Sequence, residues 1–101
     1  MIKVNLEQSG KHFSVRVQGH AGASKFGEDV VCAAASILVL ALQQALSKSG
    51  AEDLEYSIAK GNFYIKAKCT QRALHNLEAI ICGFDFLANA YPQYVNMCVA
   101  N

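Results

Sequence analysis

The segment from Val30 to Leu42 constrains the fold more than any other part of the chain, because its 13 residues are nearly all apolar. A helix on the surface of a globular protein needs an apolar stripe only about 100° wide, whereas this segment is apolar nearly all round. The run is shorter than the ~18 residues that cross a bilayer, which favours a core helix. We expect this helix to extend from Asp29 to Ser47 and to end at the turn Lys48-Ser49-Gly50.

The sequence also predicts the strands against which this helix packs. Apolar and polar residues alternate with a period of two in the segments 2–6, 13–17, 54–58 and 63–67. Such alternation is typical of strands that bury one face. The turn sequences Ser9-Gly10-Lys11 and Lys60-Gly61-Asn62 separate the members of each pair, so we expect two β-hairpins.

A second helix follows the second hairpin. Thr70 is a suitable N-cap, Tyr91-Pro92 ends the helical pattern, and residues 95–99 alternate as a last short strand. The apolar stripe of this helix consists of Leu74, Leu77, Ile81, Phe84 and Ala88. The order ββαββαβ predicts the α+β fold class, with an antiparallel sheet packed against two helices in a small two-layer domain. Without an internal linker, residues 1–101 are expected to form a single domain.

The first helix carries more apolar surface than this architecture covers. One face packs on the sheet, and one flank meets the second helix. The remaining apolar surface requires either an unusually deep position in the domain or a partner chain. We expect the partner chain to be a second copy, which makes the protein a homodimer.

Composition and charge exclude several classes of protein. Hydrophobic residues make up 52% of the chain and charged residues 17%, which excludes intrinsic disorder. The formal net charge is +1, and the aromatic residues fit core alternation, so we expect no direct nucleic-acid binding. The amino-terminal residues lack the apolar core of a signal peptide. We therefore expect a cytoplasmic protein without membrane association.

The cysteines do not form a recognisable metal or redox motif. Cys32, Cys69, Cys82 and Cys98 include no C-x-x-C pair, which zinc ribbons and thiol redox motifs require. Disulfides are rare in cytoplasmic proteins, so we expect none here, and no metal or cofactor. We interpret Cys69, Cys82 and Cys98 as packing residues.

One stretch combines residue types that support nucleophilic chemistry. His20 follows the second strand, a loop bounded by Gly22 and Gly27 comes next, and Cys32 falls in the first helical turn if Asp29 is the N-cap. The positive end of the helix dipole favours a thiolate there. Backbone N–H groups of the same turn lack intrahelical partners and are suited to hold an oxyanion.

Each of these residues also has a purely structural interpretation. A cysteine in an apolar helix is usually a small buried hydrophobe, and a histidine at a strand end usually lies on the surface or fills space. Asp29 is most simply an N-cap. Ser36, four residues after Cys32, is on the same helix face and can bond back to the helix backbone. The spacing alone does not place His20 within reach of Cys32.

The same stretch resembles the signature of the ribosomal-processing cysteine protease family, Prp. The matching residues are Gly19-His20-Ala21, followed by Gly27-x-Asp29-x-Val31-Cys32-Ala33-Ala34-x-Ser36. The resemblance covers the whole chain, including its length, element order and the ending Tyr91-Pro92-Gln93-Tyr94-Val95. Val30 stands where the family has isoleucine, and residues 23–26 follow no family pattern.

This resemblance implies a cytoplasmic, homodimeric bacterial endopeptidase with a Cys–His dyad and no cofactor. Family members remove a short amino-terminal extension from the large-subunit ribosomal protein numbered twenty-seven in the L series, cutting after an aromatic residue that follows an apolar stretch. Cys32 then corresponds to the nucleophile and His20 to the general base. Asp29 and Ser36 match supporting positions of the motif. The residues themselves, rather than the resemblance, predict a substrate loop with Gly22, Phe26 and Gly27, because the two glycines permit backbone freedom and Phe26 can contact an apolar peptide.

Two other functions compete with this interpretation. The small size of the chain also suits a non-catalytic, ribosome-associated binding module. A thiol redox sensor would need a resolving cysteine near Cys32, and the sequence has none nearby. Cleavage of a precursor peptide distinguishes the protease from the binding module.

Overall fold

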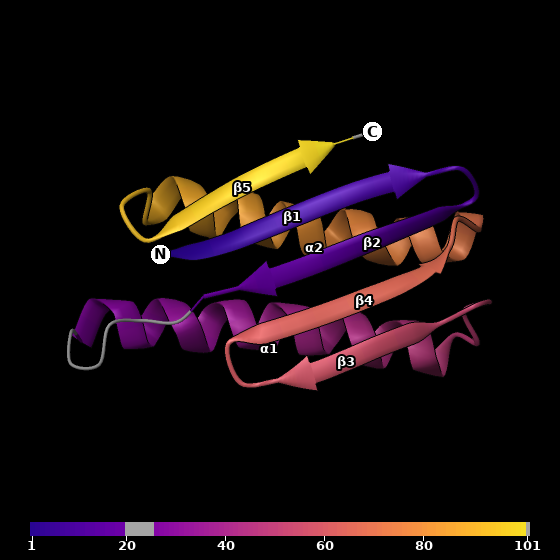
Figure 1. The fold of residues 1–101 in the computed structure, drawn as a ribbon, viewed down its shortest axis with the longest axis horizontal. Helices are drawn as coiled ribbons and strands as arrows, with labels where there is room; N and C mark the ends of the chain where they lie inside the picture. Colours follow the sequence, from indigo (N-terminus) through magenta and orange to yellow (C-terminus); the bar gives the residue numbers. More distant parts are fainter. Residues whose placement is uncertain (20–25, 101) are drawn as a thin grey trace.

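The two hairpins and two helices follow one another in the order expected from the sequence (Figure 1). The computed structural model describes residues 1–19 and 26–100, with the backbone alone for residues 26–29. The strands are β1 (Ile2–Ser9), β2 (His12–Gln18), β3 (Glu55–Ala59), β4 (Asn62–Lys68) and β5 (Val95–Ala100). The helices are α1 (Phe26–Lys48) and α2 (Gln71–Ala90). The predicted ββαββαβ order is therefore confirmed.

The sheet is mixed, although the sequence predicted antiparallel strands throughout. Its order is β3-β4-β2-β1-β5, and the first three of these pairings are antiparallel. β5 pairs with β1 in parallel, with Ile2 opposite Val95. The reason is that α2 returns the chain from the far end of β4 to the end of the sheet where β1 begins (Figure 1). β5 therefore starts beside β1 and extends in the same direction.

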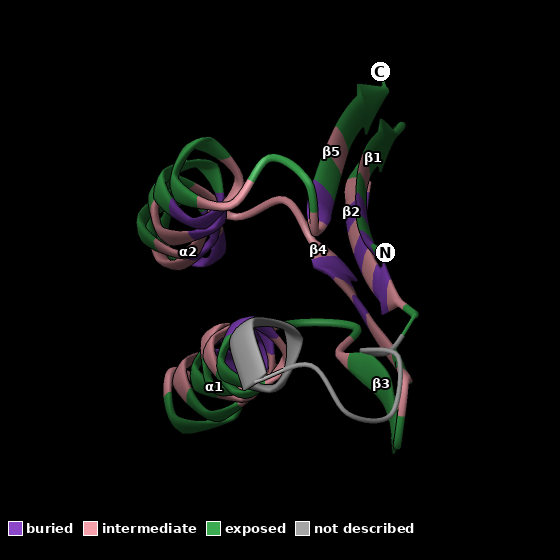
Figure 2. Ribbon diagram, turned by 90° about the vertical axis from the view of Figure 1, so that its left-hand side faces the viewer, coloured by how far each residue is buried: buried purple, intermediate pink, exposed green. Residues whose placement is uncertain are grey.

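Both helices cover the same face of the sheet, which gives the two expected layers (Figure 2). The buried side chains of α1 are Val31, Ala35, Val39, Leu42 and Leu46, and those of α2 are Ala73, Leu77, Phe84 and Leu87. The segment Val30–Lys48 has the length and composition of a helix that could cross a membrane. Its buried face nevertheless packs on the strands, as expected for a core helix.

The helix boundaries confirm one predicted cap and correct another. Thr70 is the N-cap of α2, and its hydroxyl oxygen accepts a hydrogen bond from the N–H of Ala73 at 3.2 Å. The other helix, α1, begins at Phe26, so Asp29 lies inside its first turn and is not the N-cap. The residues before Asp29 contain no proline, and acidic residues at positions 28 and 29 favour a first turn that starts earlier.

Candidate active site

Six chain segments meet at one end of the domain. β2 and β3 end there, β1, β4 and β5 begin there, and the amino-terminal part of α1 passes beneath them (Figure 1). A pocket of about 170 Å³ lies between these segments. Its lining residues are Ile2, Val17, Gly19, Cys32, Ala35, Ser36, Lys60, Gly61 and Phe63. We call this cavity the Cys32 pocket.

The position of Cys32 on α1 explains why it faces this pocket. Val31 and Ala35 are buried against the sheet, whereas Cys32 is one position further round the helix and is half-buried. Ser36 lies one turn after Cys32, is also half-buried and lines the same pocket. The structure therefore brings together two of the residues that the sequence singled out. It leaves the thiol at the boundary between core and solvent.

The expected oxyanion site in the first turn requires a correction. Because α1 begins at Phe26, Cys32 lies in the second helical turn. Only the first four N–H groups of a helix, counted from its N-cap, lack intrahelical acceptors, so in α1 these groups all lie before Asp29. The N–H of Cys32 is thus part of the helical hydrogen-bond ladder. The described part of α1 does not offer spare N–H groups beside the thiol.

Gly19 fixes the point where the chain leaves β2. Its N–H donates a hydrogen bond to the carbonyl oxygen of Gly61 at 3.0 Å, which extends the β2–β4 ladder beyond Gln18 and Asn62. Its φ is +104°, and a Cβ at this position would collide with the carbonyl oxygen of Met1. Glycine is therefore required both by the backbone angle and by the close approach. The residue that follows Gly19 is His20.

Several predicted site residues lie outside what the structure describes. His20 and Gly22 fall in the segment 20–25, which is not described. Phe26, Gly27 and Asp29 belong to the first turn of α1, of which only the backbone is described. The expectation that Phe26 and Gly27 belong to a loop was wrong, because the helix already begins at Phe26. Contacts of these five residues with a substrate or with one another remain predictions. For the predicted site, the described residues test only whether Cys32 and Ser36 lie together.

Sequence reasoning missed most of the lining of the Cys32 pocket. Ile2, Val17 and Phe63 were expected as core-facing strand residues, and Lys60-Gly61 as part of a hairpin turn. Periodicity identifies the buried face of each strand, but it does not show which strand ends meet. These residues converge because β4 pairs directly with β2, although α1 separates the two strands in the sequence. No local signal in the sequence identifies that convergence.

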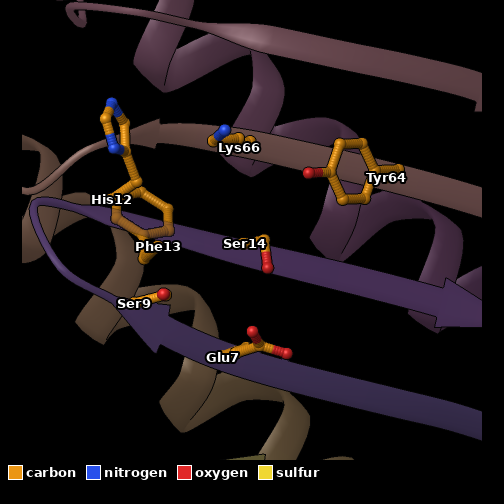
Figure 3. A pocket seen from close by; sticks show the side chains of 7 residues that line it. All are labelled: Glu7, Ser9, His12, Phe13, Ser14, Tyr64 and Lys66. Atoms are coloured by element: carbon orange, nitrogen blue, oxygen red, sulfur yellow. The ribbon is translucent and has the colours of Figure 1, made fainter. Parts of the chain in front are cut away.

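A larger pocket, of about 340 Å³, lies elsewhere on the sheet and lacks a thiol (Figure 3). It is lined by Glu7, Ser9, His12, Phe13, Ser14, Tyr64 and Lys66. His12 lies at the opposite end of β2 from Gly19, roughly 20 Å away at about 3.3 Å per residue. Its imidazole ring is already hydrogen-bonded, because Nε2 lies 3.0 Å from a carboxylate oxygen of Asp53. This hydrogen bond holds the pKa of Asp53 below its ordinary value.

The remaining cysteines lie away from the Cys32 pocket. Cys69 is half-buried and packs against the core, as expected. Cys82 and Cys98 are exposed, so their interpretation as packing residues was wrong. Cys82 is on the outer side of α2, and Cys98 is on an edge strand, where burial is incomplete. Cys69, Cys82 and Cys98 are free thiols, so no disulfide links the four cysteines.

The described side chains do not form a metal site. Over residues 1–19 and 30–100, no group of three or more His, Cys, Asp or Glu side chains is placed to hold a metal ion. His75, the other described histidine, is exposed on α2. Two described thiols line pockets: Cys32 lines the Cys32 pocket, and the exposed Cys82 lines a separate hollow on α2.

Sequence comparisons identify relatives over nearly the whole chain. A family model described as cysteine protease Prp matches residues 1–96. A protein of Staphylococcus aureus (strain Mu50 / ATCC 700699), named ribosomal processing cysteine protease Prp, is 29% identical over 100 residues, which cover 95% of this chain and 94% of that protein. A protein of the same name from Mycoplasma pneumoniae is 28% identical over 97 residues, covering 95% and 92%.

Solved structures share the fold. The essential ribosomal processing protease Prp of S. aureus, in complex with a covalently linked product peptide, superposes with a TM-score of 0.83 at 21% identity, covering 98% of this chain and 99% of that chain. The structure of SMU.848 from Streptococcus mutans gives a TM-score of 0.76 at 28% identity, covering 100% and 96%. The mixed sheet with both helices on one face is thus an arrangement already seen in proteins of this size.

Proposed function

Since this chain belongs to the cysteine protease Prp family, we propose that it removes the short amino-terminal extension of a ribosomal protein precursor in the cytoplasm. The proposed substrate is the large-subunit protein numbered twenty-seven in the L series. The observation that carries this proposal is the Cys32 pocket, where the motif cysteine, Ser36 and the glycine before His20 lie together. The relatives are named for ribosomal processing, and the S. aureus protein binds a substrate peptide.

The proposed reaction uses Cys32 as nucleophile and His20 as proton carrier. His20 takes the thiol proton, and the thiolate attacks the scissile carbonyl carbon to form a tetrahedral oxyanion. The C–N bond then breaks, His20 donates its proton to the leaving amine, and a thioester remains on Cys32. A water molecule attacks this thioester while His20 removes a proton from the water. The carboxylic acid product leaves, and Cys32 regains its thiol.

The assignment of His20 follows from the positions of the other histidines. The chain has three, and the two described ones are His12, which binds Asp53, and His75, which is exposed on α2. Neither lines the Cys32 pocket. His20 directly follows Gly19, which does line it. This adjacency supports the proposal that His20 is the histidine of the dyad.

Ser36 and Asp29 are proposed to support the dyad in different ways. Ser36 adds a hydroxyl to a pocket whose other lining is mostly apolar, so it is placed to donate a hydrogen bond to a substrate carbonyl. Asp29 precedes Cys32 by three residues on the same helix and is not its N-cap. We propose that its carboxylate orients the imidazole of His20, a role that capping would not provide.

The direct test is cleavage of a precursor peptide. The purified protein is incubated with a peptide that contains the extension and the first residues of the mature ribosomal protein, and the products are identified by mass spectrometry. We expect one cut at the end of the extension and none in a peptide that contains only the mature sequence. Binding of the precursor peptide without any cleavage would instead support the non-catalytic module.

Gly19→Ala is expected to lower kcat about 10- to 100-fold, because the added Cβ pushes the chain away from Met1 just before His20. Gly10→Ala is the matched control. Gly10 also has a positive φ, of +60°, but has no atom within 4 Å of an added Cβ. Both variants lose about 1 kcal/mol from the strained backbone angle, measured by thermal unfolding. Equal kcat values in the two variants would show that Gly19 has only a structural role.

We also propose that the outer face of the helix layer binds a second copy of the chain. Ile37 of α1 and Phe86 of α2 are 66% and 78% exposed, and both line an apolar groove of about 490 Å³. This is the surplus apolar surface that the sequence predicted for the first helix. Sedimentation at micromolar concentration should give about twice the 10.9 kDa of one chain, and Phe86→Asp should give the monomer. A wild-type mass near 10.9 kDa would contradict the homodimer.

A further inference from the structure

The strand β3 forms an open edge of the sheet. It is the first strand in the order β3-β4-β2-β1-β5, so no strand in the described part of the chain pairs with its outer side. All five of its residues are exposed. On an edge strand, alternate residues direct both their N–H and their C=O groups away from the sheet. β3 thus presents backbone hydrogen-bonding groups that another extended chain can use.

Two apolar side chains of β3 project on the same side of the sheet as the helices. Tyr56 pairs with the buried Ile65, and Ile58 pairs with Phe63, so both face the helix layer. They nevertheless remain 50% and 41% exposed. Edge strands are usually protected by charged residues or proline, but the only charge within β3 is Glu55 at its start. Tyr56 and Ile58 therefore form an apolar strip along an unprotected edge.

This strip is continuous with the Cys32 pocket. Ile58 lies opposite Phe63, and Phe63 lines that pocket. β3 ends at Ala59, and the next two residues, Lys60 and Gly61, are also pocket residues. Figure 1 shows the end of β3 directed toward the end of the molecule where α1 begins. A chain laid along β3 would therefore be directed toward the end of the sheet that holds the Cys32 pocket.

We propose that β3 binds the substrate polypeptide as an added strand and leads its scissile bond into the Cys32 pocket. The inference rests on the proposed proteolytic function, because a protease must hold its substrate in an extended form across the reactive thiol. Backbone hydrogen bonds to β3 supply affinity for any extended segment. Tyr56 and Ile58 select a segment with apolar side chains at alternate positions, because side chains on one face of a strand recur every second residue.

The opposite edge of the sheet provides a comparison. β5 is the other edge strand, and Val99 on it is 62% exposed on the same side of the sheet. Val99 pairs with Leu6, whereas the pocket residue Ile2 lies at the other end of β1. The exposed apolar side chain of β5 therefore lies toward the end of the sheet away from the Cys32 pocket, although β5 begins beside Ile2. Val99 is a matched control for an exposed aliphatic side chain on an edge.

Binding can be measured without cleavage in Cys32→Ala protein. The probe is the precursor peptide, labelled for fluorescence anisotropy, and the variants Tyr56→Ser, Ile58→Ser and Val99→Ser are each added to that background. We expect Kd to rise roughly tenfold for Tyr56→Ser and for Ile58→Ser. In each variant, the contact that the protein side chain makes with an apolar side chain of the bound peptide is lost. Val99→Ser should leave Kd unchanged. All three positions are exposed, so the fold should persist, which circular dichroism checks.

A second measurement tests the backbone contacts. N-methylation of single substrate amides should weaken binding at alternate residues only, because only every second amide of an added strand faces β3. Equal Kd values for the three serine variants, or the absence of alternation, would overturn the added strand. A change of oligomeric state in the β3 variants without a change in Kd would assign this edge to a second copy of the chain and also overturn the inference.

The outcome separates this inference from the proposed function. Wild-type cleavage of the precursor peptide, with unchanged Kd in the two β3 variants, overturns the added strand and leaves the protease assignment intact. If the precursor peptide is neither bound nor cleaved, the substrate proposal and the added strand both fail. Alternating methylation effects together with weaker binding in both β3 variants support the added strand.

Discussion

Replacing Cys32 with alanine is expected to reduce cleavage of the precursor peptide by about 10⁴-fold or more, to the background rate. Alanine has no atom that can form the thioester. The fold should persist, because Cys32 is only half-buried and alanine is the best helix-forming residue. Thermal unfolding of the variant should therefore stay close to that of the wild type. Cys32→Ser should be nearly as inactive, since a hydroxyl ionises far less readily than a thiol.

The other three cysteines provide the controls for this result. Cys82→Ala and Cys98→Ala change exposed side chains, and neither residue lines the Cys32 pocket. Both variants should keep wild-type activity. Cys69→Ala removes a side chain that packs against the core, so it should lower stability more than activity. If Cys32→Ala still cleaved the peptide and another cysteine variant did not, the nucleophile would have been assigned to the wrong residue.

His20→Ala is expected to lower kcat by about 10²- to 10⁴-fold, with a smaller effect on KM. The variant loses the group that accepts the thiol proton and later protonates the leaving amine. Alkylation of Cys32 by iodoacetamide gives a second measurement, because only the thiolate reacts. In the variant, alkylation should be slower than in the wild type under the same conditions, because the proposed proton acceptor is absent.

The other histidines again provide matched controls. His75→Ala changes an exposed residue on α2, and His12→Ala removes the hydrogen bond to Asp53. Neither change should affect kcat or the rate of alkylation. In His12→Ala the pKa of the Asp53 carboxyl should rise toward its ordinary value, because its hydrogen bond to His12 is lost. Wild-type kcat in His20→Ala would contradict the dyad.

Periodicity was sufficient to predict every helix and strand, but not how the last strand pairs. The alternation of Val95, Met97 and Val99 predicts a strand with one buried face; Val95 and Met97 do pack in the core, whereas Val99 is 62% exposed. It contains no information on which neighbour the strand joins or in which direction. The parallel pairing with β1 depends on the path of α2 across the whole sheet. That path is a property of the tertiary structure.

The candidate site was predictable where it depends on residue type and spacing along one helix. Cys32 and Ser36 are four residues apart, so they share a helix face in any helix that contains both. The start of α1 was less predictable, because Asp29 is equally suitable as an N-cap and as a first-turn residue. The contribution of Phe63 depends on long-range strand pairing, which local patterns do not specify.

The pairing of β5 with β1 joins residues from opposite ends of the chain, and this has a consequence for synthesis on the ribosome. The N–H of Ile2 donates to the carbonyl oxygen of Tyr94 at 2.8 Å, and Ile2 also lines the Cys32 pocket. Contacts between residues so distant in sequence form late, because the loop between them must close first. The amino-terminal wall of the pocket can therefore be fixed only after β5 has left the exit tunnel. A nascent chain that already contains Cys32 would still lack the completed Cys32 pocket.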